Sequence, residues 1–98
     1  MAAPLKVRWL RTALANLEAE AQFIARDNPD AAARVVARIV TAVDKLTFHP
    51  DLSRLGRVAG TRELVVTGTP YIVPYRVSDE AIQILRVFHA ARRWPQRL

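Results

Sequence analysis

The last third of the chain, residues 61–94, contains three strand-like runs that are separated by two short turn signals. The runs are Thr61–Thr67, Tyr71–Val77 and Ala81–Ala90. Alternation of aromatic and β-branched residues with a period of two is typical of sheet strands, and Gly, Pro, Ser and Asp between the runs favour tight reversals. This stretch therefore predicts a three-stranded antiparallel meander.

Strict alternation along the third run predicts which of its side chains share a face. It places Leu85 and Val87 on the face that packs against helices, and Ile82, Ile84 and Phe88 on the other face. In the second run, Pro74 has no N–H to donate to a ladder. Pro74 is therefore expected at a bulge, or with its nitrogen side unpaired.

The first half of the chain predicts one short strand and two helices. Leu5–Trp9 alternates apolar and basic residues, as a strand that joins the later sheet would. A helix is expected over about residues 11–26, and a second helix from Asn28-Pro29 to about Phe48. Asn28 is a favourable N-cap, and Pro29 at the first helical position loses only an N–H that would be unpaired anyway. The two helices should form an antiparallel hairpin across the sheet.

The apolar spacing of three and four residues defines the expected buried face of each helix. For the first helix these residues are Leu14, Leu17, Ala21 and Ile24. For the second they are Ala32, Val35, Val36, Ile39, Val43 and Leu46. The fold class is therefore α+β, with one domain over residues 1–98 and a sheet of roughly four strands.

Composition excludes several classes of site. Cysteine is absent and the two histidines are forty residues apart, so no metal site and no disulfide is expected, and no motif indicates a cofactor. His49, just before Pro50, is interpreted as the end of the second helix rather than as a ligand or base. No apolar run approaches the roughly 20 residues of a membrane span, and no signal peptide begins the chain, which fits a cytoplasmic location.

The net charge of +6 is concentrated toward the C-terminus. Residues 81–98 carry four arginines and no acid, which favours a polyanion or an acidic protein as partner, or else a merely solubilising surface. The candidate functional residues are basic or aromatic side chains of the last third: Arg62, Tyr71, Tyr75, Arg76, Arg86, His89, Arg92, Arg93 and Trp94. Such a set suits either an RNA-cleaving site, with a general acid or base beside bound phosphate, or a recognition surface without chemistry.

Two segments, RELVVTGTPYIVPYRV and ILRVFHAARRWP, together with the order strand, two helices, three strands, resemble the RelE/ParE superfamily of bacterial type II toxin–antitoxin toxins. The resemblance covers nearly the whole chain and is strongest to the ParE-like, plasmid-stabilisation branch. It implies growth inhibition by a toxin that a cognate antitoxin neutralises, the antitoxin being a small acidic protein of ribbon-helix-helix type.

The superfamily holds two activities, and the resemblance leaves both open. RelE-type toxins are ribosome-dependent mRNA endonucleases, and for that reading the implied catalytic residues are Arg62, Arg76, His89 and Arg92. ParE-type toxins inhibit DNA gyrase through protein–protein contact. The chain has no lysine in Thr61–Thr67, has Ile72 where RelE-type enzymes place an arginine, and has no tyrosine after Tyr75. These departures favour the gyrase reading, without catalysis, over a nuclease. A toxin relic that serves only in a complex is a third alternative.

For the gyrase reading, the resemblance implies a target-binding surface at the end of the last strand. Its expected members are Arg86, His89, Arg92, Arg93 and Trp94. Trp94 would supply an aromatic anchor, and the arginines would supply forked donors to carboxylates of the target.

Overall fold

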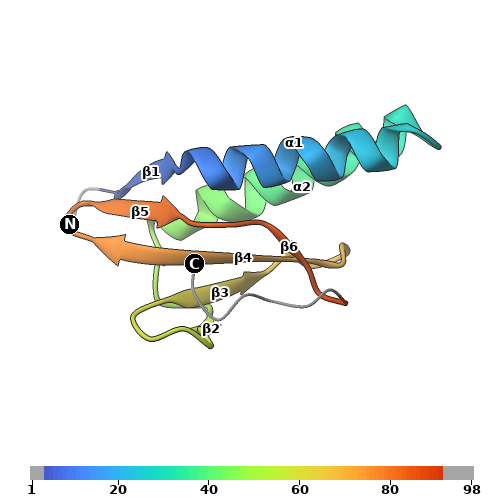
Figure 1. Cartoon of the computed structure of the whole chain (residues 1–98). Helices are drawn as coiled ribbons and strands as arrows, with labels where there is room; N and C mark the ends of the chain where they lie inside the picture. The colour runs from blue at the N-terminus through green and yellow to red at the C-terminus, as the bar shows by residue number, and fades with distance from the viewer. Residues whose placement is uncertain (1–3, 92–98) are drawn as a thin grey trace.

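Two helices lie side by side across one face of a mixed β-sheet in the computed structural model, which describes residues 4–91 (Figure 1). The helices are α1 (Arg11–Ala25) and α2 (Pro29–Asp44), and the 3₁₀ turn η1 (Lys45–Thr47) follows α2. The strands are β1 (Lys6–Trp9), β2 (Arg54–Leu55), β3 (Arg62–Val65), β4 (Tyr71–Ser78), β5 (Ala81–Ile84) and β6 (Phe88–His89). The predicted α+β class and the helical hairpin are confirmed.

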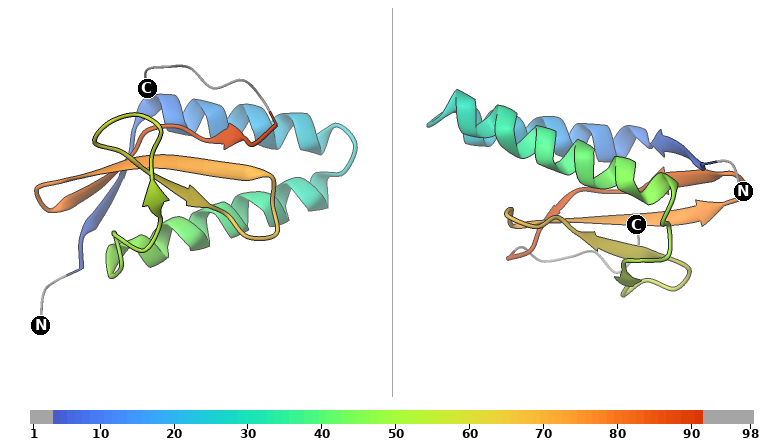
Figure 2. Two further views of the ribbon diagram at one scale, coloured as in Figure 1. Left: turned by 90° about the horizontal axis from the view of Figure 1, so that it is seen from below. Right: turned by 180° about the vertical axis from the view of Figure 1, so that it is seen from behind.

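The sheet has the order β1-β5-β4-β3-β2, and β6 pairs with β4 beyond the end of β5. The meander β3-β4-β5 is antiparallel, as predicted, whereas β1 pairs parallel to β5 with Lys6 opposite Ala81. The first and last thirds of the chain therefore meet at one edge of the sheet, while β2 forms the opposite edge (Figure 2).

The sequence signals at the start of α2 act as expected. The Asn28 side-chain oxygen accepts a hydrogen bond from the Ala31 N–H at 3.0 Å, and Pro29 occupies the first helical position. Asp30 in the first turn complements the partial positive charge of the helix N-terminus. This well-marked start fixes the direction in which α2 returns along α1.

The hydrophobic core lies between the helical hairpin and one face of the sheet. Its sheet side is formed by alternate residues of β4 and β5, and its helix side mainly by α2. The fully enclosed members are Ala13, Ile39, Val43, Val73, Tyr75, Ile82 and Ile84. Four residues of the predicted buried face of the second helix, Ala32, Ile39, Val43 and Leu46, are buried. Val35 and Val36 are only partly buried.

The predicted buried stripe of α1 needs one correction. Ala13 is fully buried, while its neighbour Leu14 is 50% exposed. Leu17 and Ile24 do pack against the core, as partly buried side chains. The helix is rotated so that a small alanine faces the sheet, which lets α1 lie close to it.

The expected single strand Ala81–Ala90 is interrupted, and the reason is Pro74. Ile84 lies opposite Tyr75 and Phe88 lies opposite Ile72, so three residues, 85–87, face only two residues of β4. This is the geometry of a β-bulge with one extra residue. Pro74 sits at the bulge, as predicted; it has no N–H to donate there, although its carbonyl still accepts the Leu85 N–H at 3.0 Å.

The faces predicted for this run were only partly right. Val87 faces the helices and Phe88 does not, as predicted, but Ile82 and Ile84, which were predicted on the other face, also lie in the core. The reason is the bulge, which shifts the alternation by one residue after Ile84. Leu85 is also buried, but it stands outside the core cluster that contacts the helices, so the prediction that it faces the hairpin was wrong. The Val87 N–H leaves the sheet ladder and donates to the Asn16 side-chain oxygen on α1 at 3.2 Å.

A pair of valines three residues apart on α2 tests the position of the core. We expect Val43→Ala to lower the free energy of unfolding by about 2 kcal/mol, because Val43 is fully buried and its methyl groups would leave a cavity. Val40→Ala makes the same chemical change at a position that is 38% exposed, where the better helix propensity of alanine offsets the lost contact. Urea unfolding followed by circular dichroism measures both; equal losses would contradict the assigned orientation of α2.

Candidate functional site

Arg62 binds the backbone of the connector, residues 48–61, which joins η1 to β3. Its guanidinium is therefore not part of an open site. Its guanidinium donates to the carbonyl oxygens of Ser53 at 2.8 Å and Asp51 at 3.2 Å. Tyr75, directly opposite Arg62 in the sheet, donates its hydroxyl hydrogen to the Pro50 carbonyl at 2.5 Å and shares a further hydrogen bond with Ser53. Burial raises the pKa of Tyr75 above its ordinary value. These bonds fasten the connector to the sheet.

Arg76 and His89 lie on opposite faces of the sheet. Arg76 is exposed on the face away from the helices, because it follows Tyr75 in the alternation of β4. His89 lies opposite Tyr71, and the two rings meet edge to face with centroids 5.6 Å apart. The His89 Nδ1 accepts the Ala91 N–H at 3.2 Å, while the Tyr71 hydroxyl donates to Glu20 on α1 at 2.9 Å.

The structure therefore does not bring the three described residues of the nuclease hypothesis together. Arg62 and His89 share a face, but they flank positions four residues apart on β4, or about 13 Å at the usual rise per residue. Arg76 is on the other face. Of the target-binding residues, Arg86 and His89 are partly exposed around the bulge, whereas Arg92, Arg93 and Trp94 lie outside the described residues.

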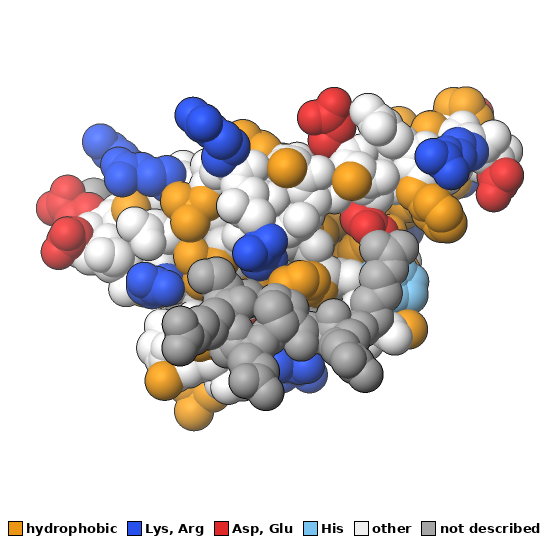
Figure 3. Space-filling view, viewed as in Figure 1, with side chains coloured by type: hydrophobic (Ala, Val, Ile, Leu, Met, Phe, Trp, Pro, Cys, Tyr) orange, Lys and Arg blue, Asp and Glu red, His pale blue; other side chains and the backbone are white. Residues whose placement is uncertain are grey.

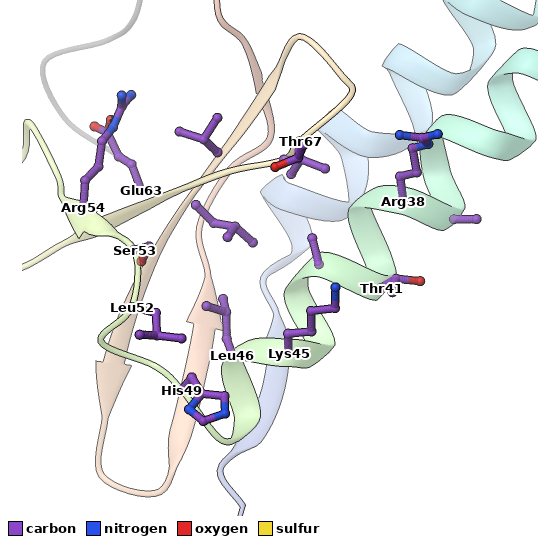
Figure 4. A pocket seen from close by; sticks show the side chains of 15 residues that line it. Arg38, Thr41, Lys45, Leu46, His49, Leu52, Ser53, Arg54, Glu63 and Thr67 are labelled. Atoms are coloured by element: carbon purple, nitrogen blue, oxygen red, sulfur yellow. Dashed lines mark hydrogen bonds and ion pairs between the residues drawn. The ribbon is translucent and has the colours of Figure 1, made fainter.

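A groove of about 780 Å³ lies between α2, the connector and β3 (Figure 4). Leu46, Leu52, Leu64 and Val65 give it apolar surface. Its basic lining residues are Arg38, Lys45, His49 and Arg54. The sequence carried no pattern that predicts this groove; the structure shows it through Leu52, a lining residue that is 76% exposed.

One wall of the groove is a strand edge that β2 covers only in part. β2 pairs with Arg62 and Glu63 alone. Since the Val66 N–H donates to Tyr71 of β4, the backbone groups of the preceding Val65 point away from β4, toward the groove. Within residues 4–91 these groups of Val65 have no hydrogen-bond partner, so the edge offers a donor and an acceptor beside an apolar surface.

A buried carboxylate holds β2 and the following turn against β3. Glu63 is 3% exposed; its Oε1 accepts from Arg54 at 2.8 Å, and its Oε2 accepts from the Arg57 backbone N–H at 2.9 Å and side chain at 3.1 Å. Burial alone raises the pKa of the Glu63 carboxyl, but the hydrogen bonds from Arg57 and Arg54 together outweigh burial, so that pKa lies below its ordinary value. Gly56 is required nearby, because a Cβ there would approach the Thr61 hydroxyl to 2.1 Å.

The described residues offer no alternative centre of metal chemistry, since no three His, Cys, Asp or Glu side chains among them come together. Nor does any helix in the described part of the chain have the length and apolarity needed to cross a membrane.

Comparison with known proteins defines the class. The chain matches the ParE toxin of type II toxin–antitoxin systems, parDE, over residues 7–94. It is 52% identical to toxin Y4kP of Sinorhizobium fredii over 93 residues, covering 95% of this chain and 96% of the relative. It is 42% identical to toxin RelE2 of Caulobacter vibrioides over 87 residues, covering 89% of this chain and 97% of the relative.

Solved structures agree with this class. The chromosomal ParDE system from P. aeruginosa matches with a TM-score of 0.80 and 30% identity, covering 90% of this chain and 98% of that chain. The RelBE2 toxin–antitoxin complex of Mycobacterium tuberculosis matches with a TM-score of 0.65 and 28% identity, covering 88% and 98%. The protein is thus a type II toxin–antitoxin toxin of the RelE/ParE superfamily. Within the superfamily, the chain belongs to the ParE toxin family.

The Glu63 cluster predicts a pH dependence of stability. Because the folded-state pKa of Glu63 is depressed, the stabilisation is fully present above the unfolded-state pKa of about 4.3 and is lost as the pH falls through the folded-state pKa. Glu63→Gln should cost about 1–3 kcal/mol at pH 7, because Arg54 and Arg57 lose their charged acceptor, and should flatten the stability profile below about pH 5.

Glu80→Gln supplies the matched control for that experiment. Glu80 is exposed in the turn after β4, so the same removal of charge should leave the free energy of unfolding within about 0.5 kcal/mol of the parent. Urea unfolding at several pH values between 3 and 7, an interval of about four units around the carboxyl range, gives both profiles. A parallel loss in the two variants would mean that Glu63 contributes only net charge.

Proposed function

We propose that this toxin acts in the bacterial cytoplasm by inhibiting DNA gyrase through protein–protein contact. The observation that supports this most is the separation of Arg62, Arg76 and His89. Arg62 is occupied by backbone carbonyls of the connector, and Arg76 lies on the other face of the sheet from His89. A general acid or base needs to lie within hydrogen-bond reach of the group it serves, and phosphate-binding cations need to lie around the same phosphate.

The target surface in this proposal begins at the bulge. Arg86 and His89 are its described members, and Arg92, Arg93 and Trp94 continue it along the sequence. Arginine suits such a contact because its planar fork bonds carboxylates in pairs. In this proposal His89 contributes a partly exposed polar ring, held edge to face against Tyr71 and by the hydrogen bond from the Ala91 N–H to its Nδ1.

The proposed partner that neutralises the toxin is an acidic cognate antitoxin, which docks in the groove beside α2. The solved relatives named as ParDE and RelBE2 systems support an antitoxin partner. The groove combines apolar lining with Arg38, Lys45 and His49 at its helix side, so an amphipathic segment with acidic residues would complement it. The free backbone groups of Val65 suit an extended stretch of the same segment. We expect the DNA-binding part of the antitoxin to be of ribbon-helix-helix type.

Ribosome-dependent mRNA cleavage is the second candidate, and one observation favours it. The relative from Caulobacter vibrioides, 42% identical, carries the name RelE2. If this activity were present, His89 would be its acid or base, with the arginines binding phosphate.

The two functions are separated by one pair of assays on four toxins, the parent and three variants. In gyrase supercoiling, the parent and His89→Gln should inhibit equally, while Arg86→Gln should need about tenfold more toxin, the effect of losing one good interfacial contact. The control Arg34→Gln removes the same charge from an exposed site on α2 and should inhibit like the parent. Cleaved mRNA in a translating extract that disappears with His89→Gln, together with undisturbed supercoiling, would overturn the gyrase proposal.

The groove proposal is tested by two leucines of nearly equal exposure. Leu52 lines the groove and is 76% exposed, whereas Leu55, in β2, is 77% exposed and is not among the lining residues. Leu52→Asp should weaken binding of the cognate antitoxin at least tenfold, or about 1.4 kcal/mol, because it removes an apolar contact and adds a charge of the antitoxin's own sign. Leu55→Asp should change binding by less than about threefold. Isothermal titration measures both, and equal weakening would exclude the groove.

A further inference from the structure

A row of polar residues crosses three strands on the face of the sheet that the helices leave uncovered. Arg8 of β1 lies beside Gln83 of β5, and Gln83 lies opposite Arg76 of β4. Their neighbours Val7 and Ile82 point into the core, so the alternation of the strands places the row on the opposite face. Strands lie about 4.8 Å apart, so the two arginines are anchored about 10 Å from each other with the Gln83 amide between them.

A second row of residues, Lys6, Ala81 and Ser78, lies next to the first, toward the β4–β5 turn. Lys6 lies beside Ala81, which lies opposite Ser78. Lys6, Arg8 and Arg76 are all exposed, and Gln83 is partly exposed. Three cations thus lie on this face together with the polar side chains of Gln83 and Ser78. We call Lys6, Arg8, Arg76 and Gln83 the basic row.

The charges of the basic row are not used within the described part of the chain. None of the three cations has a hydrogen bond or ion pair to residues 4–91. The carboxylate of Glu63, on the same face, is already ion-paired with Arg54 and Arg57. Asp79 and Glu80 lie in the turn beyond Lys6 and Ser78, farther from the arginines, and Figure 3 shows acidic side chains gathered at that tip of the molecule.

We propose that the basic row binds the phosphate backbone of a nucleic acid. Arginine pairs with phosphate through two parallel hydrogen bonds, and an amide such as that of Gln83 donates to phosphate or sugar oxygens. An acidic protein surface is the weaker candidate, because protein interfaces depend on buried aromatic or apolar anchors and the basic row has none. Spaced cations among polar groups suffice for binding without base recognition.

This inference goes beyond the proposed function and does not depend on it, since gyrase works on DNA and translation works on mRNA. It places a second contact on a different face from the antitoxin groove. A toxin held by such a contact would meet its target in the nucleic-acid-bound form rather than free in solution. The basic row could not be predicted from the sequence, because its members come from segments that are far apart along the chain.

The test is the salt dependence of binding by the full toxin chain to labelled duplex DNA and to labelled single-stranded RNA of mixed sequence. The double variant Arg8→Gln/Arg76→Gln removes two cations of the basic row while keeping side chains of similar polarity. Its control, Arg26→Gln/Arg34→Gln, removes the same charge from two exposed positions on the helical hairpin. Circular dichroism of each variant confirms that all four substitutions leave the fold intact.

The expected result is specific to the basic row. For duplex DNA, the slope of log Kobs against log salt should fall in magnitude by about 2 in the row variant, and by much less in the control variant. For single-stranded RNA the expected fall is about 1.4. The nucleic acid that binds with the lower Kd identifies whether DNA or RNA is the source of the phosphates. Equal slope changes in row and control variants, or no binding of either nucleic acid at about 50 mM salt, would overturn the proposal.

Discussion

The arrangement of the C-terminal part of this toxin depends on one missing hydrogen-bond donor. Pro74 sits in the middle of β4, the central strand of the sheet, and cannot donate an N–H toward its neighbour. One extra residue forms a bulge between β5 and β6 opposite this position. Each side chain after the bulge therefore lies on the other face of the sheet from the one that strict alternation would give it. Val87 enters the core, its N–H turns to Asn16 on α1, and His89 comes to rest against Tyr71.

The other side of the sheet is governed by a second local constraint, the burial of Glu63. Two arginines and a backbone N–H satisfy its carboxylate, and in doing so they hold β2 across only the first part of β3. The rest of β3 remains an open edge above apolar side chains. In a protein that works alone, such an edge would be a hazard for aggregation. In a toxin that is made together with a neutralising partner, the same edge is suited to a docking site.

The sequence was informative where a local rule decides the structure. Asn28 and Pro29 mark the start of α2, and the spacing of Ile39 and Val43 marks its buried face, because capping and helical periodicity act within a few residues. The proline at a bulge was also predictable from its chemistry. The direction of the sheet edge at β1 was not, since parallel pairing with β5 joins segments from opposite ends of the chain.

The candidate sites were harder to predict for the same reason. Arg62 was a catalytic candidate, but in the structure it binds the backbone carbonyls of Asp51 and Ser53 and so anchors the connector. No residue pattern in the sequence predicts this contact. β2 has only two residues and carries no periodic signal. The groove arises from what β2 fails to cover, and the basic row arises from register across three strands; both are properties of the assembled sheet.

The parallel pairing of β1 with β5 also sets how late in synthesis the sheet can be completed. β1 is among the first segments to leave the ribosome, but its sheet neighbour is synthesised almost last, so β1 has no strand to join until translation is nearly complete. At about 5–20 residues per second, the growing chain spends several seconds without a finished sheet. A message broken or stalled before the codons of β5 yields a chain that cannot close its core. A chain that ends before β5 leaves β1 without its sheet neighbour, so the complete sheet requires translation through Ile84.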